Sequence, residues 1–327
     1  MRTKMRRTVR HLAIAIGSLL LCHGAQADVY PSRPIQLVVP YPPGASTDTL
    51  ARKIAQKMSE TLGQPVVIQN KGGASGAIGT EFLSRAEPDG YTLGIGNPST
   101  HTLPVALGKK TPYDPVNDFT PISSLVNNQV VLAVNPQLPV KSVSELLDYA
   151  RKNPTGVSFS SPGYGTSHHL FGEMLNESTG INMLHVSYRG GGPAITDLVG
   201  GQVPIGVASV VSIRGLANDG KVRILCVLGE DRLAGLPGVE TIREVLPEFN
   251  VRPVWTGIFA PAGLPDAIAD RLTEAVVAAV RDPETNRFLE ENGLAPVGST
   301  RAEFAKILAD DIESWGAVVR SRNLTGE

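Results

Sequence analysis

The chain has 327 residues, of which 42% are hydrophobic and 19% are charged. A chain of this length and composition buries a full hydrophobic core and has room for two lobes. Beyond its first residues, no low-complexity tract or block of like charge interrupts it, which excludes a disordered linker and an extended basic surface.

The N-terminal segment, residues 1–27, has the pattern of a secretory signal peptide. Its first 11 residues include five Lys or Arg and no acid, and the 11 that follow are apolar. Ala25 and Ala27 then form a small-x-small cleavage site, which makes Asp28 the expected first residue of the mature protein. The apolar run is much shorter than the roughly 20 residues that cross a bilayer. We therefore expect a soluble protein that is exported to the periplasm.

Removal of this segment changes the charge and the cysteine count. Of the 30 basic residues five are lost, so 25 remain against 31 acidic residues, and we expect no nucleic-acid partner. Cys22 is lost too. Leu21 stands before it, where lipoprotein processing needs a small residue, so we expect no lipid anchor. Cys226 is then the one cysteine of the mature sequence, and its apolar surroundings predict a buried structural residue.

The remaining sequence alternates between two kinds of pattern. Short runs rich in Val and Ile, each closed by Pro, Gly, Asn or Ser, predict buried parallel strands. Stripes of apolar residues at helical spacing predict helices over residues 50–62, 268–280 and 304–315. The alternation predicts an α/β fold with helices on both faces of the sheets. The strand runs are 34–40, 64–70, 91–97, 130–136, 156–162, 183–189, 203–209 and 222–228.

Four of the strand-to-helix turns combine glycines with Ser, Thr, Asp or Pro at the helix start. Glycine lets backbone N–H groups approach a ligand closely, and the first N–H groups of a helix have no partner inside it. With the helix dipole they attract an anion, and in open α/β sheets such turns lie at the carboxyl ends of the strands. The sequence therefore predicts a site for a small anion, most simply a carboxylate, in a cleft between two lobes. The turns are 40–51, 70–83, 161–175 and 187–200.

Six segments, in order and at matching spacing, resemble successive signatures of a known family. The family is that of the periplasmic solute receptors of tripartite tricarboxylate transporters, the Bug family. The resemblance runs from about residue 30 to the carboxyl end. The segments are YPSRPIQLVVPYPPGASTDTLAR, DGYTLGIGN, TPYDPVNDFTPIS, GYGTSHHLFGEM, VSYRGGGPAITDLVGGQV and FAPAGLP.

The resemblance implies a type II periplasmic binding fold, in which each of two lobes is a mainly parallel sheet flanked by helices and the ligand cleft lies between them. It places residues 28–125 and 254–327 in the first lobe and residues 126–253 in the second. It implies a receptor that captures a small organic acid and delivers it to a membrane permease. We expect no catalysis, no cofactor and a monomer.

The resemblance also implies that two loops, residues 41–48 and 163–169, grip the carboxylate. This sequence departs from the family pattern at Ala45, where a second Gly is usual, and at Ala77, where Asn is usual. No particular family ligand therefore carries over. The predicted ligand-binding residues are Tyr41, Pro43, Gly44, Ser46, Asp48, Gly76, Ala77, Thr100, Gly163, Gly165, Thr166, Ser167, His169, Arg189, Gly190 and Ser209.

Several of these residues have a second interpretation. Ser46, Thr47 and Asp48 stand where helix caps stand, and Asp48 is alternatively an acceptor for the ammonium group of an amino acid. Arg189 is either a clamp for a second carboxylate or a solvated surface residue.

The sequence also bears on two other classes of function, metal binding and ester hydrolysis. His168 and His169 are adjacent, so on a helix their side chains point about 100° apart, and no metal-binding spacing is present. We therefore expect no metal. The turns lack the Gly-x-Ser-x-Gly elbow of α/β hydrolases and also lack a phosphate loop. The alternative to a receptor is a secreted hydrolase of small esters that uses Ser167 and His169.

Overall fold

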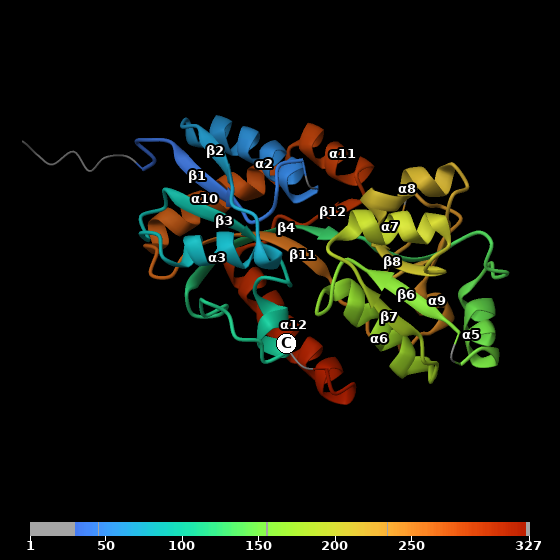
Figure 1. Cartoon of the computed structure of the whole chain (residues 1–327). Coiled ribbons are helices and arrows are strands. Elements are labelled where there is room, and N and C mark those ends of the chain that lie inside the picture. Colours follow the sequence, from blue (N-terminus) through green and yellow to red (C-terminus); the bar gives the residue numbers. More distant parts are fainter. Residues whose placement is uncertain (1–29, 45, 155, 234, 325–327) are drawn as a thin grey trace, which may run out of the picture. The chain divides into compact units, whose positions relative to one another are not determined.

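A computed structural model of the chain describes residues 30–44, 46–154, 156–233 and 235–324. Its contacts group the chain into two compact units, Met1–Ser32 and Arg33–Glu327. In the first unit the described residues are 30–32, where the peptide bond before Pro31 is cis. The predicted signal peptide, its cleavage site and Cys22 lie outside the described residues. The strands and helices below all belong to the second unit (Figure 1).

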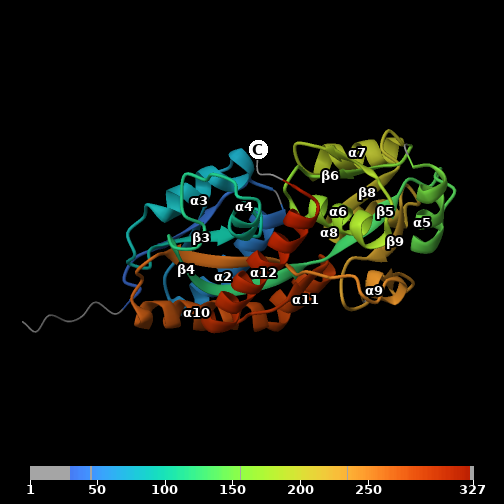
Figure 2. The ribbon, with the colours of Figure 1, turned by 90° about the horizontal axis from the view of Figure 1, so that it is seen from below.

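The first sheet has six strands in the order β12-β4-β11-β3-β1-β2. β1 pairs in parallel with β2 and β3, whereas β11 runs antiparallel to β3 and β4, and β12 runs antiparallel to β4. Figure 2 shows α3 and α4 on one side of this sheet and α10 on the other. The strands are β1 (Ile35–Val39), β2 (Val66–Asn70), β3 (Thr92–Gly96), β4 (Phe119–Asn128), β11 (Val254–Pro261) and β12 (Leu294–Pro296). The helices are α2 (Ser46–Leu62), η1 (Ala74–Gly76), α3 (Ala77–Ser84), α4 (Thr102–Ala106), α10 (Asp266–Arg281), α11 (Pro283–Glu291) and α12 (Arg301–Ser321).

The second sheet also has six strands, in the order β10-β9-β5-β8-β6-β7. β6 pairs in parallel with β7 and β8, and β9 pairs in parallel with β10. β5 is antiparallel to both β8 and β9. The strands are β5 (Val130–Val134), β6 (Ser158–Ser161), β7 (Leu184–Ser187), β8 (Ile205–Ser209), β9 (Arg223–Val227) and β10 (Glu240–Thr241). The helices are α5 (Val143–Lys152), α6 (Ser167–Thr179), α7 (Gly191–Gly200), α8 (Val210–Asn218) and α9 (Ile242–Val245).

The predicted strands exist, but not all of them are parallel. Each predicted run contains a strand of one of the two sheets. The prediction of mainly parallel sheets is wrong for the first sheet, where β11 runs antiparallel to β3 and β4. The prediction of a parallel β5 is also wrong, because β5 runs antiparallel to β8 and β9. These strands lie where the chain crosses between the sheets: it leaves the first sheet within a single residue after β4 and returns through β11. β5 continues in the direction of β4 as the chain crosses, and it therefore lies antiparallel to its neighbours β8 and β9 in the second sheet.

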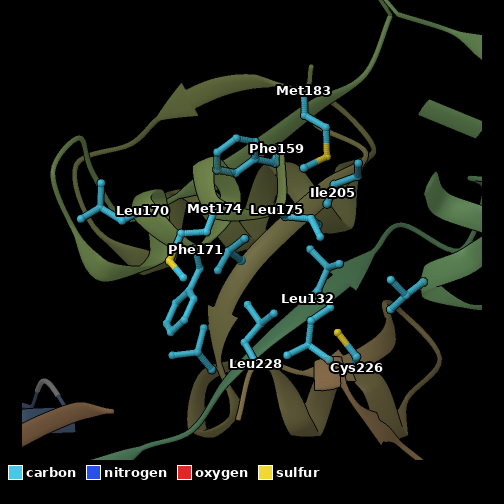
Figure 3. Close-up of a cluster of buried hydrophobic side chains, with 14 of the residues drawn as sticks. Leu132, Phe159, Leu170, Phe171, Met174, Leu175, Met183, Ile205, Cys226 and Leu228 are labelled. Atoms are coloured by element: carbon cyan, nitrogen blue, oxygen red, sulfur yellow. The ribbon is translucent and has the colours of Figure 1, made fainter. Parts of the chain in front are cut away.

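The core of the second sheet is built from aliphatic and aromatic side chains of its strands and of α6 (Figure 3). Phe159 and Leu170 are fully buried there, as is Cys226, whose thiol pKa is raised chiefly by that burial. Cys226 is a free cysteine, which confirms its interpretation as a structural residue. No helix in the described part of the chain combines the length and the apolar character that a membrane crossing requires.

Helix α12 contacts the cores of both sheets. Near its beginning, Phe304 packs against Trp255 of β11, with ring centroids 5.3 Å apart. Near its end, Trp315 packs edge-on against Phe171 of α6 at 5.6 Å, and Val318 and Val319 join the same cluster. The C-terminal helix therefore ties α6 to the first sheet.

Candidate functional site

Three helices of the second sheet begin at one edge of that sheet. β8, β6 and β7 are neighbours and run parallel, so their carboxyl ends meet, and α8, α6 and α7 follow them directly. Each helix start carries a partial positive charge from its dipole and its unpaired N–H groups. This edge is therefore electropositive without any cluster of basic side chains.

The first turn of α6 shows which N–H groups are free. The Gly165 N–H donates to Nδ1 of His169 at 3.1 Å, and the His169 N–H donates to Oγ1 of Thr166 at 3.3 Å. Within the described part of the chain, the N–H groups of Ser167 and His168 have no acceptor. Two adjacent donors at a helix start match the two oxygens of a carboxylate.

Thr166 is the N-cap of α6. Its hydroxyl donates to the Gly163 carbonyl at 2.7 Å and accepts the N–H of His169. Thr166 is one of the predicted ligand-binding residues, but its hydroxyl proton is used inside the loop, so this hydroxyl has no proton left to donate to a carboxylate.

His168 faces the neighbouring helix start. Its Nε2 lies 3.0 Å from Oγ of Ser209, the residue that ends β8 and precedes α8. Burial lowers the pKa of His168 to about 4, so the imidazole is neutral at neutral pH. His169, which the sequence analysis placed in the ligand shell, is only 1% exposed and lies behind the loop. Of the two histidines, His168 therefore faces the start of α8, whereas His169 is buried beneath the loop.

The start of α7 adds a further electropositive feature. Gly190 has a φ of 115°, and its N–H donates to the Pro162 carbonyl at 2.8 Å, which joins this turn to the α6 loop. The N–H groups of Gly191 and Gly192 follow in the first helical turn. Arg189 is exposed, and no acidic partner pairs with it among the described residues. Its guanidinium is available to a second anionic group.

The first sheet contributes a second group of predicted residues. The hydroxyl oxygen of Tyr41 accepts from Nδ2 of Asn97 at 2.7 Å. Burial raises the pKa of the Tyr41 phenol, which stays neutral and keeps its own proton to donate. Gly76 has a φ of 98°, and a Cβ there would lie 2.8 Å from Cγ2 of Thr100 and 3.3 Å from the Tyr41 hydroxyl. Only glycine fits beside these two side chains.

Two predicted residues of this group have internal partners. Thr100 is fully buried, and its hydroxyl bonds to Asn97 and to Nδ1 of His101. Asp48 is 3% exposed; its Oδ2 accepts from the Gly44 N–H at 2.9 Å and from Nε of Arg52 at 3.0 Å. Its Oδ1 accepts from Nδ2 of Asn70 at 2.9 Å. Asp48 therefore holds the loop before α2 in place, and its burial among these donors keeps it away from an ammonium ligand.

The Asp48 interactions predict a pH-dependent effect on stability. Burial raises the pKa of Asp48, but the bonds from Arg52, Gly44 and Asn70 outweigh it, and the pKa lies below its usual value. A lowered folded-state pKa stabilises the protein above the unfolded-state value of about 4 and loses that contribution as pH falls. We expect Asp48→Asn to lower the free energy of unfolding by about 2 kcal/mol at pH 7, with the difference shrinking below pH about 4. Urea unfolding of the two proteins at pH 7 and below pH about 4 measures the difference in their free energies of unfolding. The same difference at both pH values would contradict the prediction.

The predicted residues of the second sheet approach those of the first sheet beside α4. A Cβ at Gly165, whose φ is 70°, would lie 2.9 Å from Cδ1 of Leu107, the C-cap of α4. Leu103 and Leu107 belong to the same buried cluster as Leu170 of α6. The remaining predicted residues lie at helix starts or in exposed loop positions: Pro43, Gly44, Ser46 and Ala77.

Comparison with known proteins identifies the family. The family model described as "Tripartite tricarboxylate transporter family receptor" matches residues 50–324. The chain belongs to this receptor family. Protein BugT of Bordetella pertussis is 34% identical to this chain over 97% of each protein.

Solved structures of similar receptors agree with this assignment. The periplasmic binding protein BugD is 32% identical, with a TM-score of 0.79 over 91% of this chain and 100% of that one. An R. palustris protein with adipate is 31% identical, with a TM-score of 0.83 over 91% of this chain and 100% of that one. MatC from Rhodopseudomonas palustris with bound malate is 34% identical, with a TM-score of 0.77 over 89% of this chain and 100% of that one. The predicted two-lobed α/β receptor fold is confirmed.

Two polar residues of the candidate site are absent from the residues predicted from the sequence. Asn97 holds the Tyr41 hydroxyl, and His168 contacts Ser209. A signal for Asn97 existed, because it follows β3 directly, at the same edge as the turns after β1 and β2. His168 has no such signal, since the sequence does not say which of two adjacent histidines is buried and which faces the start of α8.

A second hollow on the described surface does not match a carboxylate site. A surface hollow of about 590 Å³ lies between α10 and the start of α12, where Asp270 and Glu274 face it together with Arg301. Arg301 is already paired with Asp270 at 3.0 Å, so this hollow has no spare positive charge for an acid. Within the described ranges, no group of three His, Cys, Asp or Glu side chains is placed to hold a metal ion.

Proposed function

We propose that this chain is a periplasmic receptor that captures a small organic acid and delivers it to the membrane permease of a tripartite transporter. The observation that carries the proposal is the pair of free N–H groups, Ser167 and His168, at a helix start among three converging helix starts. The relatives solved with adipate and with malate support a carboxylate as the ligand.

In this proposal the ligand binds between two lobes. Residues 28–125 with 254–327 form the first lobe, as expected from the sequence, but the end of β4 up to Asn128 belongs to it as well. The rest of the segment up to residue 253 forms the second lobe, and the receptor acts as a monomer without a cofactor. The second lobe binds one carboxylate through the first turn of α6, with Ser209 and the start of α7 beside it. The first lobe contributes the hydroxyl of Tyr41 and the loop that contains Pro43, Gly44 and Ser46. Because Asp48, Thr100, Thr166 and His169 have internal partners, they shape the site without contacting the ligand.

Closure of the lobes follows from contact with both of them. A ligand shifts an open-closed equilibrium only by its difference in affinity between the two states. A carboxylate held by α6 alone gains nothing from closure, whereas one that also reaches the first lobe favours the closed form. The closed form is then the one that the permease recognises.

Mass spectrometry of small molecules released from the gently denatured protein tests the proposal. We expect an organic acid, and we expect the same acid to raise the melting temperature of the emptied protein without being consumed. Hydrolysis of small esters that Ser167→Ala abolishes would instead make this chain an enzyme. Ser167 is only 3% exposed, and its hydroxyl makes no hydrogen bond to His169 in the described structure.

Arg189 decides whether the site prefers an acid with two carboxylates. We expect Arg189→Gln to weaken the binding of adipate or malate about tenfold, the effect of losing one hydrogen bond to a charged group. Binding of acids with one carboxylate should not change. Arg151→Gln, which removes an exposed guanidinium on α5, is the matched control. Equal affinities of the Arg189 variant and the unaltered protein for both kinds of acid in calorimetry would make Arg189 a solvated surface residue.

A further inference from the structure

We infer that Glu173 and Arg322 are positioning residues for the carboxylate site, and that they act through His169 to fix the loop before α6. The inference rests on the proposed function, because the loop matters only if α6 begins at the ligand. Neither residue is part of the predicted ligand shell, and Arg322 comes from the C-terminal end of α12.

His169 fixes the loop through its Nδ1. This atom accepts the N–H of Gly165 at 3.1 Å, which requires that Nδ1 carries no proton. The proton of the neutral ring is therefore on Nε2, and Nε2 lies 3.7 Å from Oε1 of Glu173. The carboxylate favours this tautomer, since it attracts the N–H that points toward it.

Glu173 is itself held in place by α12. Its Oε2 accepts from Nη2 of Arg322 at 2.9 Å and from Nε at 3.3 Å, and Glu173 is only 8% exposed. Burial raises the pKa of Glu173, but His169 and Arg322 outweigh it, so the pKa lies below its usual value and the group is ionised at neutral pH. A continuous path of contacts thus runs from α12 to Gly165.

The other face of the His169 ring is also occupied. His185 stacks on it with ring centroids 3.9 Å apart, and Nε2 of His185 lies 2.7 Å from Oγ of Ser161. The same Oγ accepts the Gly163 N–H at 3.2 Å. The turn from Gly163 to Gly165 is therefore held at one end by His185, through Ser161, and at the other end by His169. Tyr164 packs against the ring at 4.7 Å. Among the described residues, Glu173, His185 and Tyr164 therefore contact the His169 ring, and Arg322 reaches it through Glu173.

This arrangement predicts that the acceptor on His169 affects the strength of carboxylate binding. The Gly165 N–H has its partner only while the side chain at position 169 offers an acceptor at the place of Nδ1. Loss of that acceptor should loosen the loop before α6 and weaken carboxylate binding. The neighbouring imidazole keeps its own role, because burial, with a smaller contribution from His169, lowers the pKa of His185 to about 4 and leaves it neutral.

Calorimetric titration with adipate at pH 7.5 tests the inference on His169. His169→Leu removes the acceptor of the Gly165 N–H and should bind about tenfold more weakly. His169→Asn places an amide oxygen near the position of Nδ1 and should recover part of that loss. An affinity of His169→Leu equal to that of the unaltered protein, or a His169→Asn variant that binds no better than His169→Leu, would overturn the inference.

Glu173 and Arg322 are tested in the same titration. Glu173→Gln removes the negative charge that faces Nε2 of His169, so its affinity for adipate at pH 7.5 should fall several-fold. Arg322→Gln should lower the affinity similarly. Glu177→Gln and Arg320→Gln make the same changes at exposed positions of α6 and α12 and should bind like the unaltered protein. Affinities of the Glu173 and Arg322 variants that match these controls would contradict a positioning role.

Nitrogen NMR of labelled histidine separates this inference from the proposed function, because it needs no ligand. We expect His169 to carry its proton on Nε2 at pH 7.5, and Glu173→Gln to reduce that preference. A proton on Nδ1 would overturn the inference even if adipate binds. Failure of every acid to bind, with the proton on Nε2, would remove the proposed function and leave the described loop support in place.

Discussion

Replacing Ser167 by proline is expected to weaken carboxylate binding by about 10- to 100-fold, the value of one hydrogen bond to a charged group. Ser167 is the first residue of α6, the position where helices accept proline best. Thr166 before it has φ −83° and ψ 158°, a conformation that suits a residue preceding proline. The substitution therefore removes one N–H group and leaves the helix intact.

Ser167→Ala is the matched control for this substitution. Both variants lose the hydroxyl, but only the proline variant loses the N–H, so the difference between them measures the backbone group. We expect the alanine variant to bind within about threefold of the unaltered protein. Equal losses of affinity in the two variants would assign the effect to the hydroxyl and contradict the role of the backbone.

Replacing Trp315 by alanine is expected to lower the free energy of unfolding by about 3 to 5 kcal/mol. Trp315 is fully buried and packs on Phe171, so its removal leaves a cavity where α12 meets α6. The melting temperature should fall by roughly 10 °C. Calorimetric melting measures the change.

The Trp315 substitution also tests the link between the two sheets. Trp315→Phe keeps most of the buried volume and should cost much less, whereas Glu313→Ala, at an exposed position of the same helix, should cost almost nothing. A Trp315→Ala protein as stable as the Glu313 variant would mean that the contact with Phe171 contributes little.

The sequence predicts where most of the strands lie, but it does not predict the direction in which each of them runs. A strand that is buried on both faces is rich in Val and Ile, so a short segment of sequence is enough to identify it, as in β1 and β8. Direction depends on where the chain crosses between sheets. The sequence does not indicate β4, because Pro121 and the buried Ser123 and Ser124 interrupt its apolar pattern. It predicts a parallel β5, because nothing local distinguishes this strand from its parallel neighbours.

The location of the candidate site could be predicted, but the function of its side chains could not. Glycine-rich turns after strands mark the edge where helices begin, and the structure brings the turns after β6 and β7 together. Whether Asp48 or Thr166 caps its own helix or contacts a ligand depends on hydrogen bonds that form only in the folded chain. The pairing of His169 with Glu173 and Arg322 joins residues far apart in sequence, so no local pattern indicates it.

The central claim is that backbone N–H groups at the start of α6 bind the carboxylate. The most direct measurement is a proton-nitrogen NMR titration of the emptied protein with adipate, malate or the acid that copurifies with it. We expect the amide signals of Ser167 and His168 to show the largest downfield shifts and to saturate at the dissociation constant that calorimetry gives. Saturable binding that leaves these two amide signals unmoved would contradict the claim.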